Sequence, residues 1–479
     1  MLSDARHVRL CPNTKVAIYT WHGCTIDVTN VNKLDIAYVS DETNANVAYV
    51  NTHAQLEAMR DEAYATTAAA GGGGAGPRVL LVGPADSGKT CLARALLAYA
   101  IKLGRTPLLV DIDASQNVLS VPGTLAALAP TPDMITANVY ASSPVIMTGP
   151  SSSSSSSSSS GGGGGGTTTQ PIVLWYGSQD ITSHPDLYKS QITKLGMLIN
   201  DRLSHDVDMN ASGIIVNTSG TIEDVGYHYI LHAIDEFRIN VVLVLGHDRL
   251  YSMLGTHFKN KLANDNNNNY DDDDNMMGGS VDTTAAPVAV VSAAPPPPKL
   301  IKLPRSGGVS ERDSTFRRIS RSSCIKRYFY GGDTATTATT TAAPMGSRLL
   351  YSPCLLEIKL SNVHIHRITN ISLSSALLAI GAKQSTDPIQ LITLSNSDIT
   401  TRQQHALLGV CHPGAVEKYE SSIAAGGGGS ARDLWLSGVA GFVVIEKVNV
   451  DAGTISLLCP CAGCLPSCHL LIGDVYWME

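Results

Sequence analysis

The 479-residue sequence lacks three features that would place it in particular protein classes. No apolar run approaches the roughly 18 to 20 residues of a membrane-spanning helix, and the opening residues MLSDARHVRL contain no apolar core of a signal peptide. Positive charge is not in excess, because 34 Lys and Arg stand against 41 Asp and Glu, for a formal net charge of −7. These absences argue against a membrane protein and against a general nucleic-acid coat protein, so any contact with a polynucleotide has to be local.

The sequence also lacks the regular cysteine spacing of a small secreted protein. Most of the ten cysteines are scattered, which predicts reduced thiols in an intracellular protein: Cys11, Cys24, Cys91, Cys324, Cys354 and Cys411. The remaining four crowd into CPCAGCLPSC, just before His469: Cys459, Cys461, Cys464 and Cys468. Zinc binding is one interpretation, but zinc ligands usually form two pairs separated by a longer loop, so a proline-containing turn between two strands is favoured.

The most informative stretch is GPADSGKT, which begins at Gly83 and ends at Thr90. It fits the pattern G-x-x-x-x-G-K-[ST], in which glycines let backbone N–H groups surround phosphate oxygens. The lysine then reaches the outer phosphates and the final hydroxyl ligates Mg²⁺. An apolar strand at 78–82 precedes the motif, and a helix at 90–103 follows it, as a phosphate-binding loop requires. The sequence therefore predicts nucleoside triphosphate binding at Gly83, Gly88, Lys89 and Thr90.

Two further groups of charged residues are expected beside this loop. The next strand, TPLLVDID, ends in Asp111 and Asp113, and a carboxylate there could hold Mg²⁺ or accept a proton from an attacking hydroxyl. Asp113, one step further out, is the preferred candidate. Downstream, a basic segment follows the last apolar strand of this region. Its position predicts a mobile lid over the nucleotide rather than a solvated helix face. Its basic residues are Arg305, Arg312, Arg317, Arg318, Arg321, Lys326 and Arg327.

Low-complexity tracts and strand patterns divide the chain. Short apolar strands alternate with helix-length segments between RVLLVG and KLIKLP, which predicts an α/β fold with a mostly parallel sheet, flanked by small β-rich domains. The predicted divisions are an N-terminal β-rich domain at 1–66, a Gly-rich linker at 67–77, a central P-loop domain at 78–332, a Thr/Ala-rich linker at 333–348 and a C-terminal β-rich domain at 349–479. Flexible inserts are expected at about 142–170 and 264–298. His364 and His366 alternate along a predicted strand, and two surface imidazoles are favoured over a metal pair.

Several motifs together resemble one family, the RNA-specific polynucleotide 5′-hydroxyl kinases, in particular the Clp-type subunit of the mRNA cleavage and polyadenylation factor. The similarity covers nearly the whole chain outside the inserts. It is carried by KVAIYTWHGC, YVNTHAQLEAMR, GPADSGKT, LVDIDASQNVLSVPGTLAAL, IIVNTSG, VVLVLGHDRLY, LPRSGGVSERDSTFRR, YFYG and GFVVIEKV.

The resemblance implies a role for particular residues. ATP and Mg²⁺ are implied as ligands, with nucleotide contacts from Lys15, Gly83, Asp86, Ser87, Gly88, Lys89, Thr90 and Cys91, and with Thr90 and Asp113 on the metal. Asp113 matches the family's catalytic aspartate and acts together with Lys89, while Arg312 and Arg317 match its lid arginines. Gln116, Ser120 and the residues at 122–124 match the segment that lines the substrate side.

The resemblance also implies partners and a location. These are RNA 5′-hydroxyl ends, a scaffold subunit of the cleavage and polyadenylation factor, the tRNA-splicing endonuclease and the nucleus, with no membrane. Thr221 departs from the family, whose active members carry there a tryptophan that stacks on the RNA base. Because such stacking is worth about 1 to 3 kcal/mol, its loss predicts either a weakened kinase or an ATP-locked scaffold of the same mRNA 3′-end processing complex.

A second departure concerns the start of the chain. Family members carry a further segment there, including a glutamate that reads adenine, so the N-terminal domain is expected to be truncated or base recognition to be looser. A guanine-specific switch protein is disfavoured, since the sequence lacks an N-K-x-D motif.

Overall fold

The computed structural model describes residues 18–29, 37–39, 44–70, 74–130, 171–268, 296–331, 352–369, 390–395, 398–424 and 431–478. The expected Thr/Ala-rich linker at 333–348 and the Ser/Gly tract at 151–166 lie outside these ranges. Within them, no helix is both long enough and apolar enough to cross a membrane.

A seven-stranded sheet forms the centre of the molecule, in the order β4-β3-β2-β5-β1-β6-β7. The strands from β2 to β7 in this order pair in parallel, and β3 pairs antiparallel with β2 and β4, so β3 is the one reversed strand of the sheet. Buried apolar residues fill the inner strands because helices cover both faces of the sheet. The strands are β1 (Arg78–Val82), β2 (Leu108–Asp111), β3 (Thr124–Leu128), β4 (Ile172–Trp175), β5 (Ile214–Asn217), β6 (Val241–Leu245) and β7 (Lys299–Leu303). The predicted mostly parallel sheet is confirmed.

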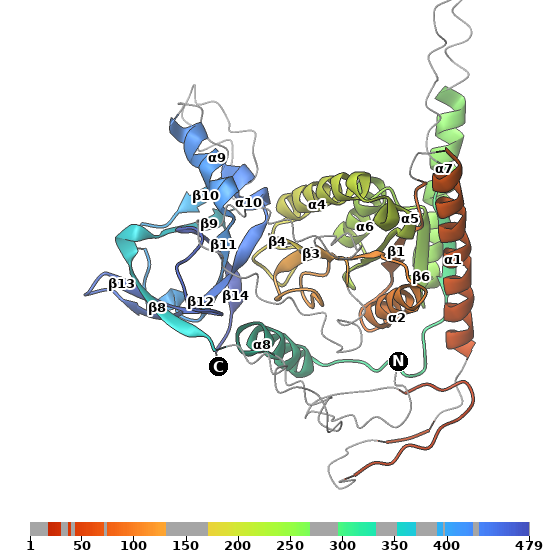
Figure 1. Cartoon of the computed structure of the whole chain (residues 1–479), viewed down its shortest axis with the longest axis horizontal. Helices are drawn as coiled ribbons and strands as arrows, with labels where there is room; N and C mark the ends of the chain where they lie inside the picture. Colours follow the sequence, from red (N-terminus) through yellow and green to blue (C-terminus); the bar gives the residue numbers. More distant parts are fainter. Residues whose placement is uncertain are drawn as a thin grey trace, which may run out of the picture.

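Helices lie on both faces and at one edge of this sheet. Figure 1 shows α4 (Pro185–His205) and α6 (Val225–Glu236) on one side and α2 (Lys89–Lys102) on the other. At the β7 edge, α1 (Asn44–Ala70) and α7 (Asp248–Asn268) both contact β7. The short helix α5 (Val207–Ser212) leads into β5.

A second seven-stranded sheet, the C-terminal sheet, has the order β10-β9-β14-β11-β12-β13-β8 and is antiparallel except where β14 pairs with β9. Its strands are β8 (Cys354–Lys359), β9 (His364–Thr369), β10 (Gln390–Thr393), β11 (Ala406–Cys411), β12 (Val439–Asn449), β13 (Thr454–Cys459) and β14 (His469–Tyr476). Two short 3-10 helices, η2 (Leu360–Asn362) and η4 (Thr401–Gln403), and the helices α9 (Pro413–Ala424) and α10 (Ala431–Leu436) complete it. The predicted C-terminal β-rich region is therefore present.

A hydrophobic core spans the two sheets, and a second, smaller cluster lies within the C-terminal sheet. Trp175 at the end of β4 lies 5.4 Å, centroid to centroid, from Phe442 on β12, and both rings are buried. The backbones also meet, because the N–H of Asp474 donates to the carbonyl oxygen of Gly177 at 2.6 Å. A Cβ on Gly473 would lie 2.0 Å from that same oxygen, so only glycine permits this approach.

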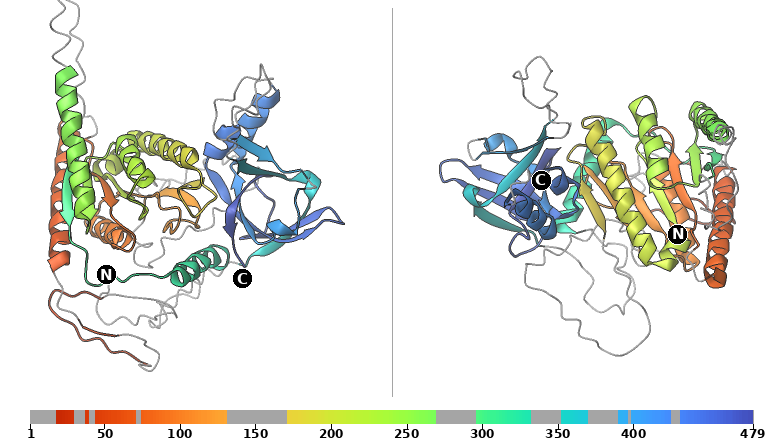
Figure 2. Two further views of the ribbon diagram at one scale, coloured as in Figure 1. Left: turned by 180° about the vertical axis from the view of Figure 1, so that it is seen from behind. Right: turned by 90° about the horizontal axis from the view of Figure 1, so that it is seen from above.

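Helix α8 (Ser314–Tyr330) connects the central region to the C-terminal sheet, and Figure 2 shows it alongside that sheet from behind. Asp313 caps its start by accepting a hydrogen bond from the Phe316 N–H at 2.7 Å. Near its other end, the Tyr328 hydroxyl accepts from the Phe442 N–H at 3.0 Å, and the Trp477 indole donates to Ser322 at 3.1 Å. The basic segment is therefore an ordered helix held at its C-terminal half by the second sheet.

Three local details differ from the sequence expectations. The stretch TLAAL was not predicted as a strand but forms β3, whose residues are all buried. Helix α1 extends to Ala70, so the first residues of the expected linker at 67–77 are helical, and α7 likewise enters the asparagine tract. The prediction of two surface imidazoles was wrong: His364 is exposed, but His366 is 2 % exposed. It is bonded to Thr393 and His469 at 2.9 Å each.

Candidate active site

The phosphate-binding loop connects β1 to α2 through residues 83–88. Gly88 has φ of 92°, in the left-handed region, and directly precedes the first residue of α2. A Cβ on Gly88 would lie 2.8 Å from the Val309 side chain, and one on Gly83 would lie 2.7 Å from the Leu245 carbonyl oxygen. The loop thus needs glycine at both motif positions, and the N-terminus of α2 that follows it attracts anions.

Two side chains in this loop fit a triphosphate. Lys89 is 6 % exposed and donates from Nζ to the carbonyl oxygens of Gly83 and Pro84, at 2.9 and 2.8 Å. Burial lowers the pKa of the Lys89 ammonium to about 8, although the charges of Asp113 and Asp86 act to raise it. The Ser87 hydroxyl is buried and has no hydrogen-bond partner in the described part of the chain. A phosphate oxygen would supply the partner that the Ser87 hydroxyl lacks.

Asp111, at the end of β2, is fully buried and committed to structural hydrogen bonds. Its carboxylate accepts from the N–H groups of Asp113 and Val118, at 3.0 and 2.8 Å, and from the Asn217 amide at 3.1 Å. Burial, and then the neighbouring charge of Asp113, raise the pKa of the Asp111 carboxyl to about 7. Asn217 also donates to the Thr90 hydroxyl at 3.3 Å, so this network positions the threonine of the motif.

Asp113 is half-buried just outside the sheet, as the sequence suggested. One of its oxygens, Oδ1, accepts from the N–H and the hydroxyl of Ser115, at 3.0 and 2.8 Å, which fixes the orientation of the carboxylate. Its charge acts to raise the pKa of Lys89 in the loop and of Arg321 on helix α8. Asp113 therefore occupies the position expected of a group that meets an incoming hydroxyl.

The basic segment closes over the loop. The Arg317 guanidinium pairs with the Asp86 carboxylate at 2.7 Å, and the Arg312 N–H donates to the same oxygen at 3.0 Å. The Arg312 side chain reaches Gln116, with Nη1 to Oε1 at 3.4 Å. Together with Val309 over Gly88, these contacts show that residues 309–317 already cover the triphosphate site.

The remaining predicted nucleotide contacts differ in their exposure, and one of them is not described by the structure. Thr90 is half-buried and Cys91 is exposed at the start of α2, while Lys15 lies outside the described residues. Tyr49 on α1 donates to the Pro304 carbonyl oxygen at 2.9 Å, so α1 holds the strand end that leads into the lid. Asn217 and Tyr49 were not identified from the sequence. The position of Asn217 at the carboxyl end of a parallel strand beside β1 was the available signal for it.

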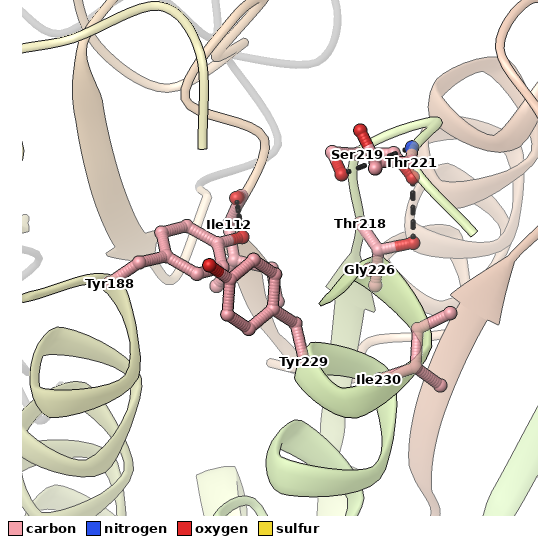
Figure 3. Close-up of a pocket in the computed structure, with 8 residues that line it drawn as sticks. All are labelled: Ile112, Tyr188, Thr218, Ser219, Thr221, Gly226, Tyr229 and Ile230. Atoms are coloured by element: carbon pink, nitrogen blue, oxygen red, sulfur yellow. Dashed lines mark hydrogen bonds between the residues drawn. The ribbon is translucent and has the colours of Figure 1, made fainter. Parts of the chain in front are cut away.

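A small cavity opens beside the loop, next to Thr221 (Figure 3). It is lined by Ile112, Tyr188, Thr218, Ser219, Thr221, Gly226, Tyr229 and Ile230, and its volume of about 10 Å³ suits one water molecule. The Tyr188 hydroxyl donates to the Ile112 carbonyl oxygen at 2.6 Å, and the buried Tyr229 ring packs 4.7 Å from that of Tyr188. Thr221 itself is exposed, and the tyrosine rings next to it are already packed inside the protein.

No group of three or more His, Cys, Asp or Glu side chains in the described ranges, the loop region included, could hold a metal ion. The cysteine-rich stretch forms the connection between β13 and β14, which agrees with the turn interpretation. Cys459 is buried, whereas Cys464 and Cys468 are exposed.

Comparison with known proteins identifies the family. Models described as "mRNA cleavage and polyadenylation factor CLP1 P-loop", "Pre-mRNA cleavage complex II protein Clp1" and "N-terminal beta-sandwich domain of polyadenylation factor" match residues 83–268, 351–479 and 2–63. A Xenopus tropicalis protein named polyribonucleotide 5′-hydroxyl-kinase Clp1 is 31 % identical over 469 residues, covering 98 % of this chain and 84 % of the relative. The mRNA cleavage and polyadenylation factor clp1 of Aspergillus niger is 31 % identical over 466 residues, covering 95 % and 83 %.

Solved structures show the same fold. A wild-type Clp1p–Pcf11p complex is similar with a TM-score of 0.60 and 22 % identity, over 91 % of this chain and 80 % of the other. The N-terminal β-rich region that the fold class includes agrees with the family model for residues 2–63. On the strength of these matches along nearly its whole length, the chain belongs to the Clp1 family of mRNA cleavage and polyadenylation factors.

Proposed function

We propose that this protein transfers the γ-phosphoryl group of ATP to the 5′-hydroxyl end of RNA, as a nuclear subunit of the mRNA 3′-end processing machinery. One observation carries the proposal. Asp113 lies beside the phosphate-binding loop with its carboxylate held by Ser115, and its charge acts on both Lys89 and Arg321. A carboxylate so placed can orient and deprotonate an acceptor hydroxyl.

Each of the other residues has a role in this reaction. Lys89 exchanges its loop carbonyls for outer phosphate oxygens, and the Ser87 hydroxyl and the loop N–H groups of residues 83–91 bind the rest of the triphosphate. Asp86 contributes its backbone, since its carboxylate already pairs with Arg317. Arg312 and Arg317 lie over the loop, where guanidinium groups stabilise charge that develops on the transferring group. Lys15 is proposed as a further nucleotide contact.

Oxygen donors at the site fit Mg²⁺, which prefers them. We assign Thr90 and Asp113 to the metal, because the oxygens of Asp111 are occupied by N–H donors. The ion, when bound, draws charge from the phosphates. Asn217 keeps the Thr90 hydroxyl in place for it.

The partners follow from the relatives. We propose that a Pcf11-like scaffold subunit binds this chain, since a neighbouring structure is a Clp1p–Pcf11p complex. We further propose an association with tRNA-splicing endonuclease, and a division of the chain into β-rich domains at 1–66 and 349–479 around a kinase domain at 78–332.

An ATP-holding scaffold is the second candidate, and Thr221 favours it. The residue is exposed and offers no ring for a base to stack on, while the neighbouring tyrosines are buried. Nucleotide would then stabilise the chain without being turned over.

Transfer of labelled γ-phosphate to a short 5′-hydroxyl RNA separates the two candidates. Label on the RNA that disappears in Lys89→Ala supports the kinase. No label, with intact ATP recovered from the purified protein, supports the scaffold and refutes the kinase.

A further inference from the structure

Helix α8 presents one face to the substrate side of the loop. Arg317 on this face pairs with Asp86, and seven residues further on the Cys324 thiol donates to the Ser120 carbonyl oxygen at 3.4 Å. Arg321 lies between them, at the i+4 position from Arg317, and residues three and four apart share a helix face. Because Arg317 contacts the loop and Cys324 contacts Ser120, Arg321 lies on the helix face between these two contacts, and the charge of Asp113 acts on it.

The surroundings of Arg321 agree with this placement. Burial lowers the pKa of its guanidinium, Arg317 lowers it further, and Asp113 acts in the opposite direction. The side chain is half-buried, yet it has no hydrogen bond or ion pair with any residue in the ranges that the structure describes. Nearby, the Ser120 hydroxyl is buried and likewise has no partner there. A half-buried guanidinium without an acceptor suits a ligand that brings an anion.

The position along the helix indicates which anion. Four residues of helix correspond to about 6 Å, so Arg321 lies one turn further from the loop than Arg317, towards the acceptor side. An acceptor hydroxyl at Asp113 belongs to the 5′ carbon of a ribose, and the next charged group along an RNA strand is the phosphodiester on the 3′ side of that ribose. Free nucleosides lack this group.

We propose that Arg321 binds the first internal phosphodiester of the acceptor strand and thereby selects polynucleotides over free nucleosides. The proposal rests on the proposed kinase function and makes Arg321 a specificity-determining residue. A guanidinium suits this contact because its planar N–H groups bind two phosphate oxygens at once, whereas an ammonium acts as a point charge.

The test compares Arg321→Ala and Arg321→Lys with Arg318→Ala, a matched control that removes the same charge from the exposed face of α8. Three acceptors are used: a 5′-hydroxyl tetraribonucleotide, adenosine 3′-monophosphate and adenosine. For Arg321→Ala we expect KM for the first two to rise about 10- to 100-fold, which matches the loss of a charged hydrogen bond. KM for ATP and the weak reaction with adenosine should stay within about twofold, and Arg318→Ala should resemble the wild type.

Two results would overturn the proposal. An equal loss with adenosine and with RNA, or a raised KM for ATP, would assign Arg321 to the triphosphate. An equal loss in Arg318→Ala would show a general charge effect.

A binding measurement separates this proposal from the kinase function. Anisotropy of a 3′-labelled 5′-hydroxyl RNA, with a non-hydrolysable ATP analogue present, needs no turnover. If the wild type binds RNA and Arg321→Ala binds it about tenfold or more weakly, Arg321 holds the strand even if no phosphate is transferred. Equal binding by the two proteins, or none by either, refutes the proposal. Circular dichroism melting should show Arg321→Ala folded, because the side chain makes no hydrogen bond or ion pair with the described chain.

Discussion

The buried ammonium of Lys89 makes nucleotide affinity depend on pH. In the free protein its pKa is about 8, because burial outweighs the charges of Asp113 and Asp86. Binding a triphosphate places several negative charges beside the ammonium and raises its pKa, so binding takes up a proton. Affinity should therefore be greatest below pH 8 and decrease above it.

The size of the effect follows from the protonated fraction. With a pKa of about 8, roughly three quarters of the free protein is protonated at pH 7.5 and about 3 % at pH 9.5. If the bound ammonium stays charged, affinity for ATP decreases about 25-fold over this range, or about 2 kcal/mol. At pH 8 each ATP should take up about half a proton.

Titration calorimetry in two buffers of different ionisation enthalpy measures both quantities. Lys89→Arg is the control, because a guanidinium stays charged throughout the range and should remove most of the pH dependence. A wild-type affinity that stays constant from pH 7.5 to 9.5, without proton uptake, would refute the assignment of a neutralisable lysine to this site.

Three further outcomes are expected. Asp113→Asn should lower kcat for RNA by about 100-fold or more while the Kd for ATP, measured by calorimetry, stays within about threefold; turnover close to wild type would exclude this carboxylate as the base. Gly473→Ala should destabilise the protein by about 1 to 3 kcal/mol in thermal melts, because the new Cβ meets the Gly177 carbonyl oxygen. Gly255→Ala on α7 has open space around it and should be neutral or stabilising. Equal effects of the two substitutions would contradict the close approach at Gly473. The pKa of His366 is lowered from 6.5 to about 4, so the histidine contributes stability above pH 6.5 that is lost as the pH decreases towards 4. The free energy of unfolding should decrease by about 3 kcal/mol over this range, and by less in His366→Gln. An equal decrease in the variant would show that other groups cause it.

Local patterns in the sequence were sufficient for the phosphate site. GPADSGKT determines its own backbone, and an apolar run before it and a helix after it are short-range signals, so Gly83, Gly88 and Lys89 could be placed in advance. The choice of Asp113 over Asp111 rested on distance from the strand end and stays a prediction, which the different surroundings of the two carboxylates support. Asp111 is buried among N–H donors, while Asp113 lies outside the sheet.

Long-range contacts could not be predicted in this way. The pairing of Asp86 with Arg317 joins residues 231 positions apart, and nothing in either segment specifies it. His366 was misjudged for the same reason, because a histidine on an alternating strand becomes buried only through its pairing with His469, 103 residues away. Strand β3 was missed because TLAAL is short and rich in alanine, so tertiary burial rather than intrinsic preference decides its conformation.

Helix α8 has a mechanical consequence. Its 17 residues form a rod about 25 Å long, with Arg317 near one end at the phosphate loop and Tyr328 near the other at the C-terminal sheet. Arg317 lies 11 residues, or about 16 Å, from Tyr328, so a tilt of about 10° at the sheet would displace it by about 3 Å, more than a hydrogen bond can stretch. A rotation of the C-terminal sheet relative to the central sheet would therefore move Arg317 away from the loop, even if its cause lay far from the nucleotide. By linkage, nucleotide that holds the arginines resists that rotation with the same free energy.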